Sequence, residues 1–60
     1  MIPKDPVMLL SYVNTQLRDY ADSLEALCNL RGIDQTELIK KTASIGYQYD
    51  KTVNQFTSKE

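Results

Sequence analysis

One stretch of the sequence, Leu27–Leu38 (LCNLRGIDQTEL), contains the end of one helix and the start of the next. Gly32 is typical of the residue that ends a helix in the left-handed conformation. Asp34, with a glutamate three residues later, is the Asp-x-x-Glu form of a capping box, and Ile33 and Leu38 hold the positions of a hydrophobic staple. The stretch therefore predicts two helices joined by a sharp corner. Such corners serve for DNA binding and as scaffolds.

Helix signals also precede this corner. Asp5 followed by Pro6 is typical of an N-cap and a first helical position. Either Asp22 or Ser23 can cap a second helix, which is expected to end near Arg31. The residues at helical spacing predict the buried faces of these two helices. They are Leu9, Leu10, Val13, Leu17 and Tyr20 in the first, and Leu24, Leu27 and Cys28 in the second.

A third helix is expected over about Gln35–Ser44, with Gly46 as its stop. Beyond it, Tyr47 and Tyr49 alternate with polar residues, which is typical of a half-buried strand. A hairpin with its loop near Asp50–Val53 places Tyr47 opposite Phe56 and aligns the aromatic side chains on one face. The alternative is a loosely attached tail.

These signals predict a mainly α (small α+β) fold, in which a three-helix domain with a helix-turn-helix-like corner precedes a short C-terminal β-hairpin. Residues 1–57 are expected to form one small domain and residues 58–60 a frayed tail. A chain of 60 residues buries only about 60% of its unfolded surface. Its expected stability is therefore only about 3–5 kcal/mol.

The residue types present argue against catalysis. The chain has no histidine and one cysteine, which excludes an internal disulfide, a zinc site built from this chain alone and a nucleophile–histidine dyad. Cys28 falls on the predicted buried face of the second helix, so we interpret it as a small core residue rather than a reactive thiol. We expect no enzyme, no cofactor and no metal site.

The net charge and the length of the apolar runs limit the kinds of partner that the protein can bind. Seven Lys and Arg residues against eight Asp and Glu residues give a net charge of −1, which argues against strong nonspecific binding of nucleic acid. The sequence shows no targeting signal, and the longest apolar run, Val7–Leu10, is too short to span a membrane. We therefore expect a cytoplasmic protein with no membrane contact.

Two function classes remain. The favoured one is a noncatalytic protein-interaction or self-association module, a homodimer included, that uses apolar surface left over by the small core. Its candidate contacts are Met8, Tyr12, Ile39, Tyr49 and Phe56. The alternative is a weak or partner-assisted DNA-binding helix-turn-helix protein, whose candidate contacts are Gln35, Thr36, Lys40 and Lys51. Arg31 and Lys41 occupy slots that are usually apolar in that motif, so the corner is interpreted first as a fold determinant.

Two polar residues of the first helix are expected to fix the helix junction. Asn14 lies on the shoulder of the apolar stripe, and Arg18 is placed to pair with Asp22 or with a carbonyl near the junction.

The opening Met1-Ile2-Pro3-Lys4-Asp5-Pro6, with the segments 14–19, 45–50 and 54–56, resembles a family of short bacterial proteins classified as a domain of unknown function. The resemblance covers nearly the whole chain. It implies a stand-alone protein and brings no activity, cofactor or binding residue.

Overall fold

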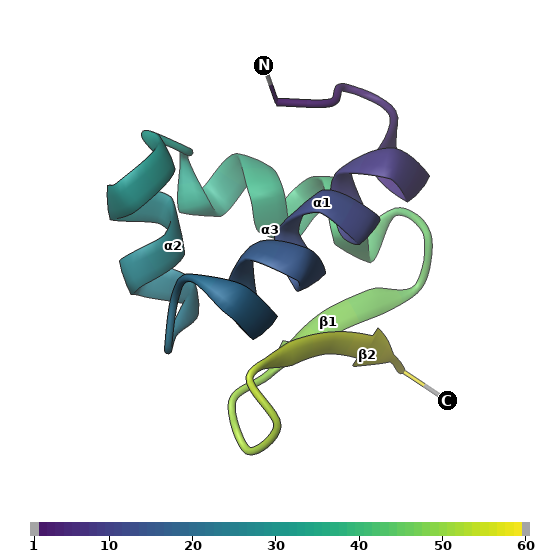
Figure 1. The fold of residues 1–60 in the computed structure, drawn as a ribbon. Helices are drawn as coiled ribbons and strands as arrows, with labels where there is room; N and C mark the ends of the chain where they lie inside the picture. Colours follow the sequence, from purple (N-terminus) through teal and green to yellow (C-terminus); the bar gives the residue numbers. More distant parts are fainter. Residues whose placement is uncertain (1, 60) are drawn as a thin grey trace.

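The computed structural model describes residues 2–59, which form three helices followed by a two-stranded antiparallel hairpin. The elements are α1 (Pro6–Asp19), α2 (Leu24–Arg31), α3 (Gln35–Ala43), β1 (Tyr47–Asp50) and β2 (Gln55–Ser58). In Figure 1, α1 crosses in front of α3, α2 stands at one side of both, and the hairpin lies beneath them. The predicted fold class, a small α+β fold, is confirmed.

Side chains cap the first two helices. The Asp5 carboxylate accepts the Met8 N–H at 3.1 Å, and Pro6 holds the first helical position, as predicted. Ser23, rather than Asp22, caps α2, because its hydroxyl accepts the Ala26 N–H at 3.0 Å. Each cap satisfies a donor that the first helical turn leaves without an intrahelical partner.

The corner between α2 and α3 forms at Gly32. This residue is left-handed, with φ of 67° and ψ of 37°. The following N–H, that of Ile33, donates to the Cys28 carbonyl at 2.9 Å, which is the long bond of a Schellman motif. A glycine takes this conformation without the steric cost that a Cβ brings.

Asp34 opens α3 directly after the corner. One carboxylate oxygen of Asp34 accepts the N–H groups of Thr36 at 2.9 Å and Glu37 at 3.3 Å. A complete capping box also has a hydrogen bond from the Asp34 backbone N–H to the Glu37 carboxylate. That bond is not formed among the described residues, so only half of the predicted capping box is present. Ile33 packs against the core that contains Leu38, as the predicted staple requires.

The core lies between the three helices and one face of the hairpin. Its buried members are Leu9, Val13, Leu17, Ala21, Leu24, Leu27, Cys28, Leu38 and Phe56. The prediction that Tyr20 belongs to the buried stripe of α1 is wrong, since this side chain is 65% exposed. The helix ends at Asp19, and the φ of −131° at Tyr20 turns its side chain away from the stripe.

The hairpin register differs from the prediction. Tyr49, not Tyr47, lies opposite Phe56, and their ring centroids are 5.6 Å apart. The loop begins one residue later than expected and ends at Asn54, whose φ of 53° is left-handed. Asn is one of the few side chains that tolerates this conformation.

The strands also continue past the predicted domain boundary. Ser58 pairs with Tyr47, and the Lys59 N–H donates to the Gly46 carbonyl at 3.0 Å. These two residues were predicted to be frayed, but backbone pairing holds them. Glu60 lies outside the described residues.

The amide side chain of Asn14 fastens β2 to α1. Its Oδ1 accepts the Phe56 N–H at 2.7 Å, and its Nδ2 donates to the Phe56 carbonyl at 3.2 Å. The Asn14 side chain therefore bonds to β2 in the way that a neighbouring strand does, because it pairs with both the N–H and the C=O of one residue. This contact joins residues 42 positions apart.

A second amide fastens the hairpin turn to the end of α1. Asn54 Nδ2 donates to the carbonyls of Leu17 and Ala21, both at 3.0 Å. Its Oδ1 accepts the Tyr49 hydroxyl at 2.6 Å. Asn54 thus satisfies carbonyls at the C-terminus of α1, which lack intrahelical partners, and fixes the Tyr49 ring.

Replacing Asn14 by Asp tests the role of this amide. The carboxylate still accepts the Phe56 N–H but cannot donate to the Phe56 carbonyl. We expect the free energy of unfolding to fall by about 2 kcal/mol, because an acceptor beside the core loses its partner. Urea unfolding measures the loss.

The matched control is Thr15→Asp, which adds the same charge on the exposed side of α1 and is expected to cost less than about 0.5 kcal/mol. Equal losses in the two variants would show that charge, rather than the bond to Phe56, accounts for the effect.

Candidate functional site

A groove of about 380 Å³ lies between α3 and β1. We call it the α3–β1 groove. It is lined by Leu24, Gln35, Ile39, Thr42, Ala43, Tyr47, Gln48, Tyr49, Phe56 and Lys59. Of these side chains only Lys59 is charged and Gln35, Thr42 and Gln48 are polar, so the groove is largely apolar, with one cation at its margin.

Backbone groups of β1 face away from its partner strand. The N–H and C=O of Phe56 bond to Asn14 rather than to β1, which makes Tyr49 and Phe56 a non-hydrogen-bonded pair. The N–H and C=O of Tyr49 therefore also point outward, and the alternation of the ladder gives Tyr47 the same orientation. Among residues 2–59 these groups have no bonding partner. We call this row the free edge of β1.

The structure brings some predicted protein contacts to this groove and separates others. Ile39, which is 44% exposed, and the half-buried Tyr49 both line it. Phe56, also a predicted contact, lines the groove but is only 3% exposed, because Asn14 holds its backbone against α1; its role as a contact stays a prediction. Met8 is 62% exposed and Tyr12 half-buried, but both lie on α1 outside the groove lining.

Sequence reasoning missed Lys59 at the groove margin. Tyr47, which also lines the groove, alternates with Tyr49 in the predicted strand, so both were expected on one face. Lys59 was assigned to the frayed tail, and only its backbone bond to Gly46 brings it to the groove margin. No local sequence pattern predicts that hydrogen bond.

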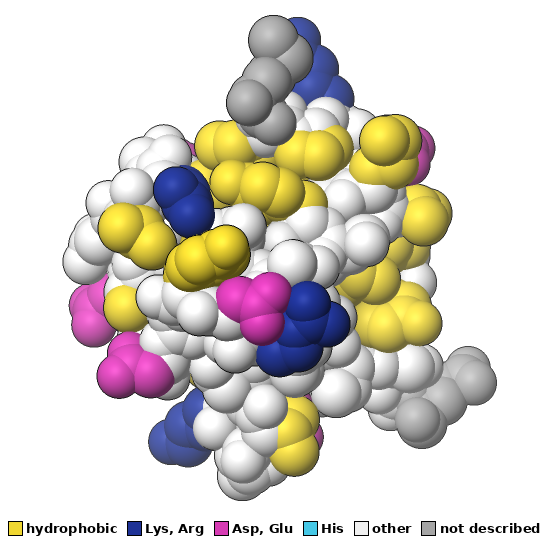
Figure 2. Space-filling view, in the orientation of Figure 1, with side chains coloured by type: hydrophobic (Ala, Val, Ile, Leu, Met, Phe, Trp, Pro, Cys, Tyr) yellow, Lys and Arg dark blue, Asp and Glu magenta, His cyan; other side chains and the backbone are white. Residues whose placement is uncertain are grey.

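The predicted DNA contacts lie on two elements. Gln35, Thr36 and Lys40 are exposed on α3, and Lys51 is exposed in the hairpin turn. On the face of the molecule shown in Figure 2, side chains of both charge signs are interspersed. That pattern differs from the basic stripe typical of a surface that binds phosphates.

Arg31, one of the two cations in a usually apolar slot, has a structural role. Its Nε donates to the buried Gln16 side chain at 2.7 Å, and its guanidinium lies 5.7 Å from the centroid of the Tyr20 ring. The arginine thus bridges α1 and α2 at the surface, and its stem covers part of the seam between them.

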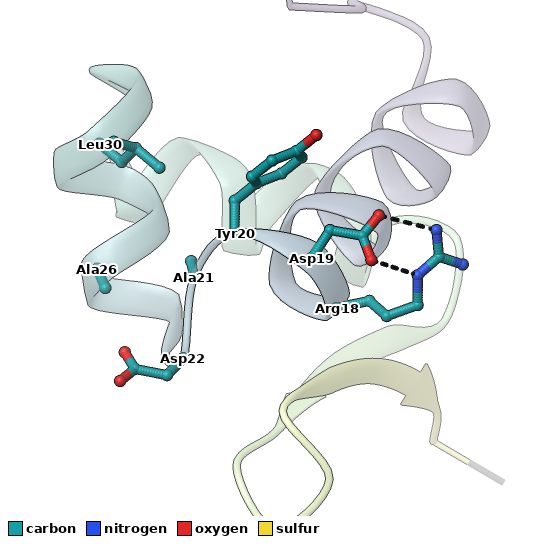
Figure 3. A pocket seen from close by; sticks show the side chains of 7 residues that line it. All are labelled: Arg18, Asp19, Tyr20, Ala21, Asp22, Ala26 and Leu30. Carbon is teal, nitrogen blue, oxygen red and sulfur yellow. Dashed lines mark hydrogen bonds and ion pairs between the residues drawn. The ribbon is translucent and has the colours of Figure 1, made fainter.

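A second hollow, of about 490 Å³, lies along this seam (Figure 3). Tyr20, Ala26 and Leu30 form its apolar part. Arg18 was expected to pair with Asp22 or a carbonyl; instead it makes a two-bond pair with Asp19, with both distances 2.9 Å. Bonding to Arg18 lowers the pKa of the Asp19 carboxyl. Since Arg18 and Asp19 already satisfy each other, the hollow offers a ligand few unpaired polar groups.

Within residues 2–59, no cluster of three or more His, Cys, Asp or Glu side chains is arranged to hold a metal ion. Burial raises the pKa of the Cys28 thiol, and the Asp34 charge adds to this, so the thiol stays protonated at neutral pH. In the same part of the chain, no helix combines the length and the apolar character that crossing a bilayer requires.

The fold and the groove define a small helical domain with a C-terminal hairpin and a free strand edge. The family model of the domain of unknown function DUF4250 matches residues 3–56, and the chain belongs to this family. No curated protein and no solved structure matches the chain. The resemblance to a domain of unknown function, inferred from the sequence, is thereby confirmed.

The protonated state of Cys28 predicts a loss of stability at alkaline pH. The pKa of this thiol is raised in the folded protein above its ordinary value of 9.0, so its contribution is complete below pH 9. Above that value the unfolded chain releases the proton first, and stability falls by at most about 1.4 kcal/mol per pH unit.

Comparing the wild type with Cys28→Ala isolates this contribution from lysine and tyrosine titration. The difference between their free energies of unfolding should be constant from pH 7 to about 8.5 and then shift against the wild type. A difference that stays constant to pH 10 would mean that the folded thiol ionises as readily as the unfolded one.

Proposed function

We propose that this protein is a noncatalytic protein-interaction module that binds an extended segment along the free edge of β1. The observation that carries the proposal is the outward row of N–H and C=O groups at Tyr47 and Tyr49, which opens onto the apolar α3–β1 groove. Strand addition of this kind draws affinity from main-chain hydrogen bonds and specificity from pockets for alternate side chains.

The groove offers a bound segment both backbone hydrogen bonds and apolar surface. The backbone of β1 supplies donors and acceptors at every second residue, which matches the repeat of an extended chain. Ile39 on α3 and the rings of Tyr47 and Tyr49 supply apolar surface for side chains of the bound segment. The hydrogen bond from Tyr49 to Asn54 holds one of these rings in place before binding.

Methylating the backbone nitrogen of Tyr49 tests the proposal. A chain of 60 residues can be made by chemical synthesis, and the methyl group removes the outward N–H while leaving every side chain in place. The probes are peptides selected from a displayed random library against the unmodified protein. We expect them to slow amide exchange at Tyr47 and Tyr49 and to bind the methylated protein at least about tenfold more weakly.

The methylated protein should unfold with the same free energy as the unmodified one, because no group within residues 2–59 accepts that N–H. A library that yields no binding peptide would contradict the proposal. Peptides that protect other amides, or that bind both proteins equally, would do so as well.

A second candidate function is binding of duplex DNA through α3. The observation in its favour is that Gln35, Thr36 and Lys40 are exposed on a helix that follows a tight corner, and side chains of these types can contact bases and phosphates. This function predicts binding of mixed-sequence duplex at low salt that Lys40→Glu weakens and Lys4→Glu leaves unchanged. Absence of binding at low salt excludes it.

A further inference from the structure

We infer that the segment docking on the free edge of β1 is β1 of a second copy of this chain, paired antiparallel about a twofold axis through Gln48. The inference rests on the proposed function, because it uses the same edge and the same groove. It adds the partner and the register. Two hairpins joined in this way form one four-stranded antiparallel sheet.

The outward backbone groups determine the register. In an antiparallel pair, both bonds are exchanged between residues whose N–H and C=O face each other. Only Tyr47 and Tyr49 of β1 present such groups, so pairing Tyr47 with Tyr49 of the second copy uses all of them. The symmetric registers centred on Tyr47 or Tyr49 would set the outward groups of the other tyrosine opposite Ile45 or Lys51, which lie outside β1.

Charge complementarity supports this register. It places Asp50 of the second copy beside Gly46, and Lys59 lies on the other side of Gly46. Continuing the strand alternation one residue beyond β2 puts Lys59, like Asp50, on the face opposite Phe56, and Gly46, the turn residue before β1, has no side chain to separate the charges. The backbones of Lys59 and that Asp50 are then about 10 Å apart, a span that a long lysine side chain crosses. The twofold axis repeats the contact.

Both charged groups are available for this contact. Lys59 forms no ion pair among the described residues, in which Arg18 and Asp19 make the sole salt bridge. Asp50 accepts the N–H and hydroxyl of Thr52 through Oδ1, at 3.0 and 2.6 Å, and among the described residues its Oδ2 accepts no hydrogen bond. These bonds lower the pKa of the Asp50 carboxyl and keep it ionised at neutral pH.

The opposite face of the sheet gains apolar contact. Tyr47 lies directly across from Tyr49 of the second copy, and aromatic pairs across neighbouring strands stabilise a sheet. These rings lie on the groove side, where Ile39 lines the opposite wall. The pairing therefore covers part of the exposed apolar surface of α3.

Sedimentation from micromolar to millimolar concentration tests the inference on the full chain. We expect a monomer–dimer equilibrium in which Lys59→Glu weakens dimerisation about tenfold, because it turns two attractive contacts into repulsions. The matched control, Lys4→Glu, makes the same charge change in the N-terminal segment, which Figure 1 shows on the far side of the helices from the hairpin. It should shift the dissociation constant less than twofold.

Methylation of the Tyr49 nitrogen should abolish the dimer, and mixing differently labelled copies should give nuclear Overhauser contacts between Tyr47 of one and Tyr49 of the other. A monomer at all concentrations, or a dimer indifferent to Lys59→Glu, overturns self-pairing. If library peptides still protect the edge of that monomer, the proposed function stands alone. A dimer indifferent to the methyl group, combined with peptides that bind elsewhere, overturns both.

Discussion

The structure depends on the paired hydrogen bonds between the Asn14 side chain and the backbone of Phe56. An isolated two-stranded hairpin is marginal in water, and helices as short as α2 and α3 need tertiary packing. Phe56 is the one buried hydrophobic residue that the hairpin contributes to the core. Asn14 allows that burial because it satisfies both backbone groups of a residue whose outward side faces α1 instead of water.

This anchoring makes the two edges of the hairpin unequal. At Phe56 the outer edge of β2 is satisfied by Asn14, and the turn is held by Asn54. Within residues 2–59, no comparable side chain bonds to the backbone of Tyr47 or Tyr49 on the outer edge of β1. An unpaired strand edge is a template for another strand, and proteins usually block such edges with charge, proline or a covering element. The fold therefore blocks one edge and leaves the other open beside an apolar groove.

The helices were predictable because their signals are local. Asp5, Pro6, Gly32 and Asp34 each act within a few residues of their own position, so caps and corner are visible in the sequence. The hairpin register was not, because Asn54 adopts its left-handed turn where it can reach carbonyls 33 and 37 positions away. Local turn propensity alone cannot predict these long-range hydrogen bonds from Asn54.

The site was predicted in part for the same reason. The predicted contacts Ile39, Tyr49 and Phe56 all line the groove, but Phe56 is buried because Asn14 draws its backbone to α1. Lys59 was missed because its position depends on a bond to Gly46 across the hairpin.

The small size of the domain explains why the outer edge of β1 is left uncovered. A chain of this length encloses little core, and a sheet of two strands lies below the number that is stable on its own. Blocking β1 with a further helix would require more chain, whereas pairing it with another strand satisfies the same backbone groups by association. On the other edge of the hairpin, the Asn14 side chain already forms the pair of hydrogen bonds to β2 that a neighbouring strand would form. The free edge of β1 presents the same outward geometry at Tyr49, but within residues 2–59 no side chain completes it.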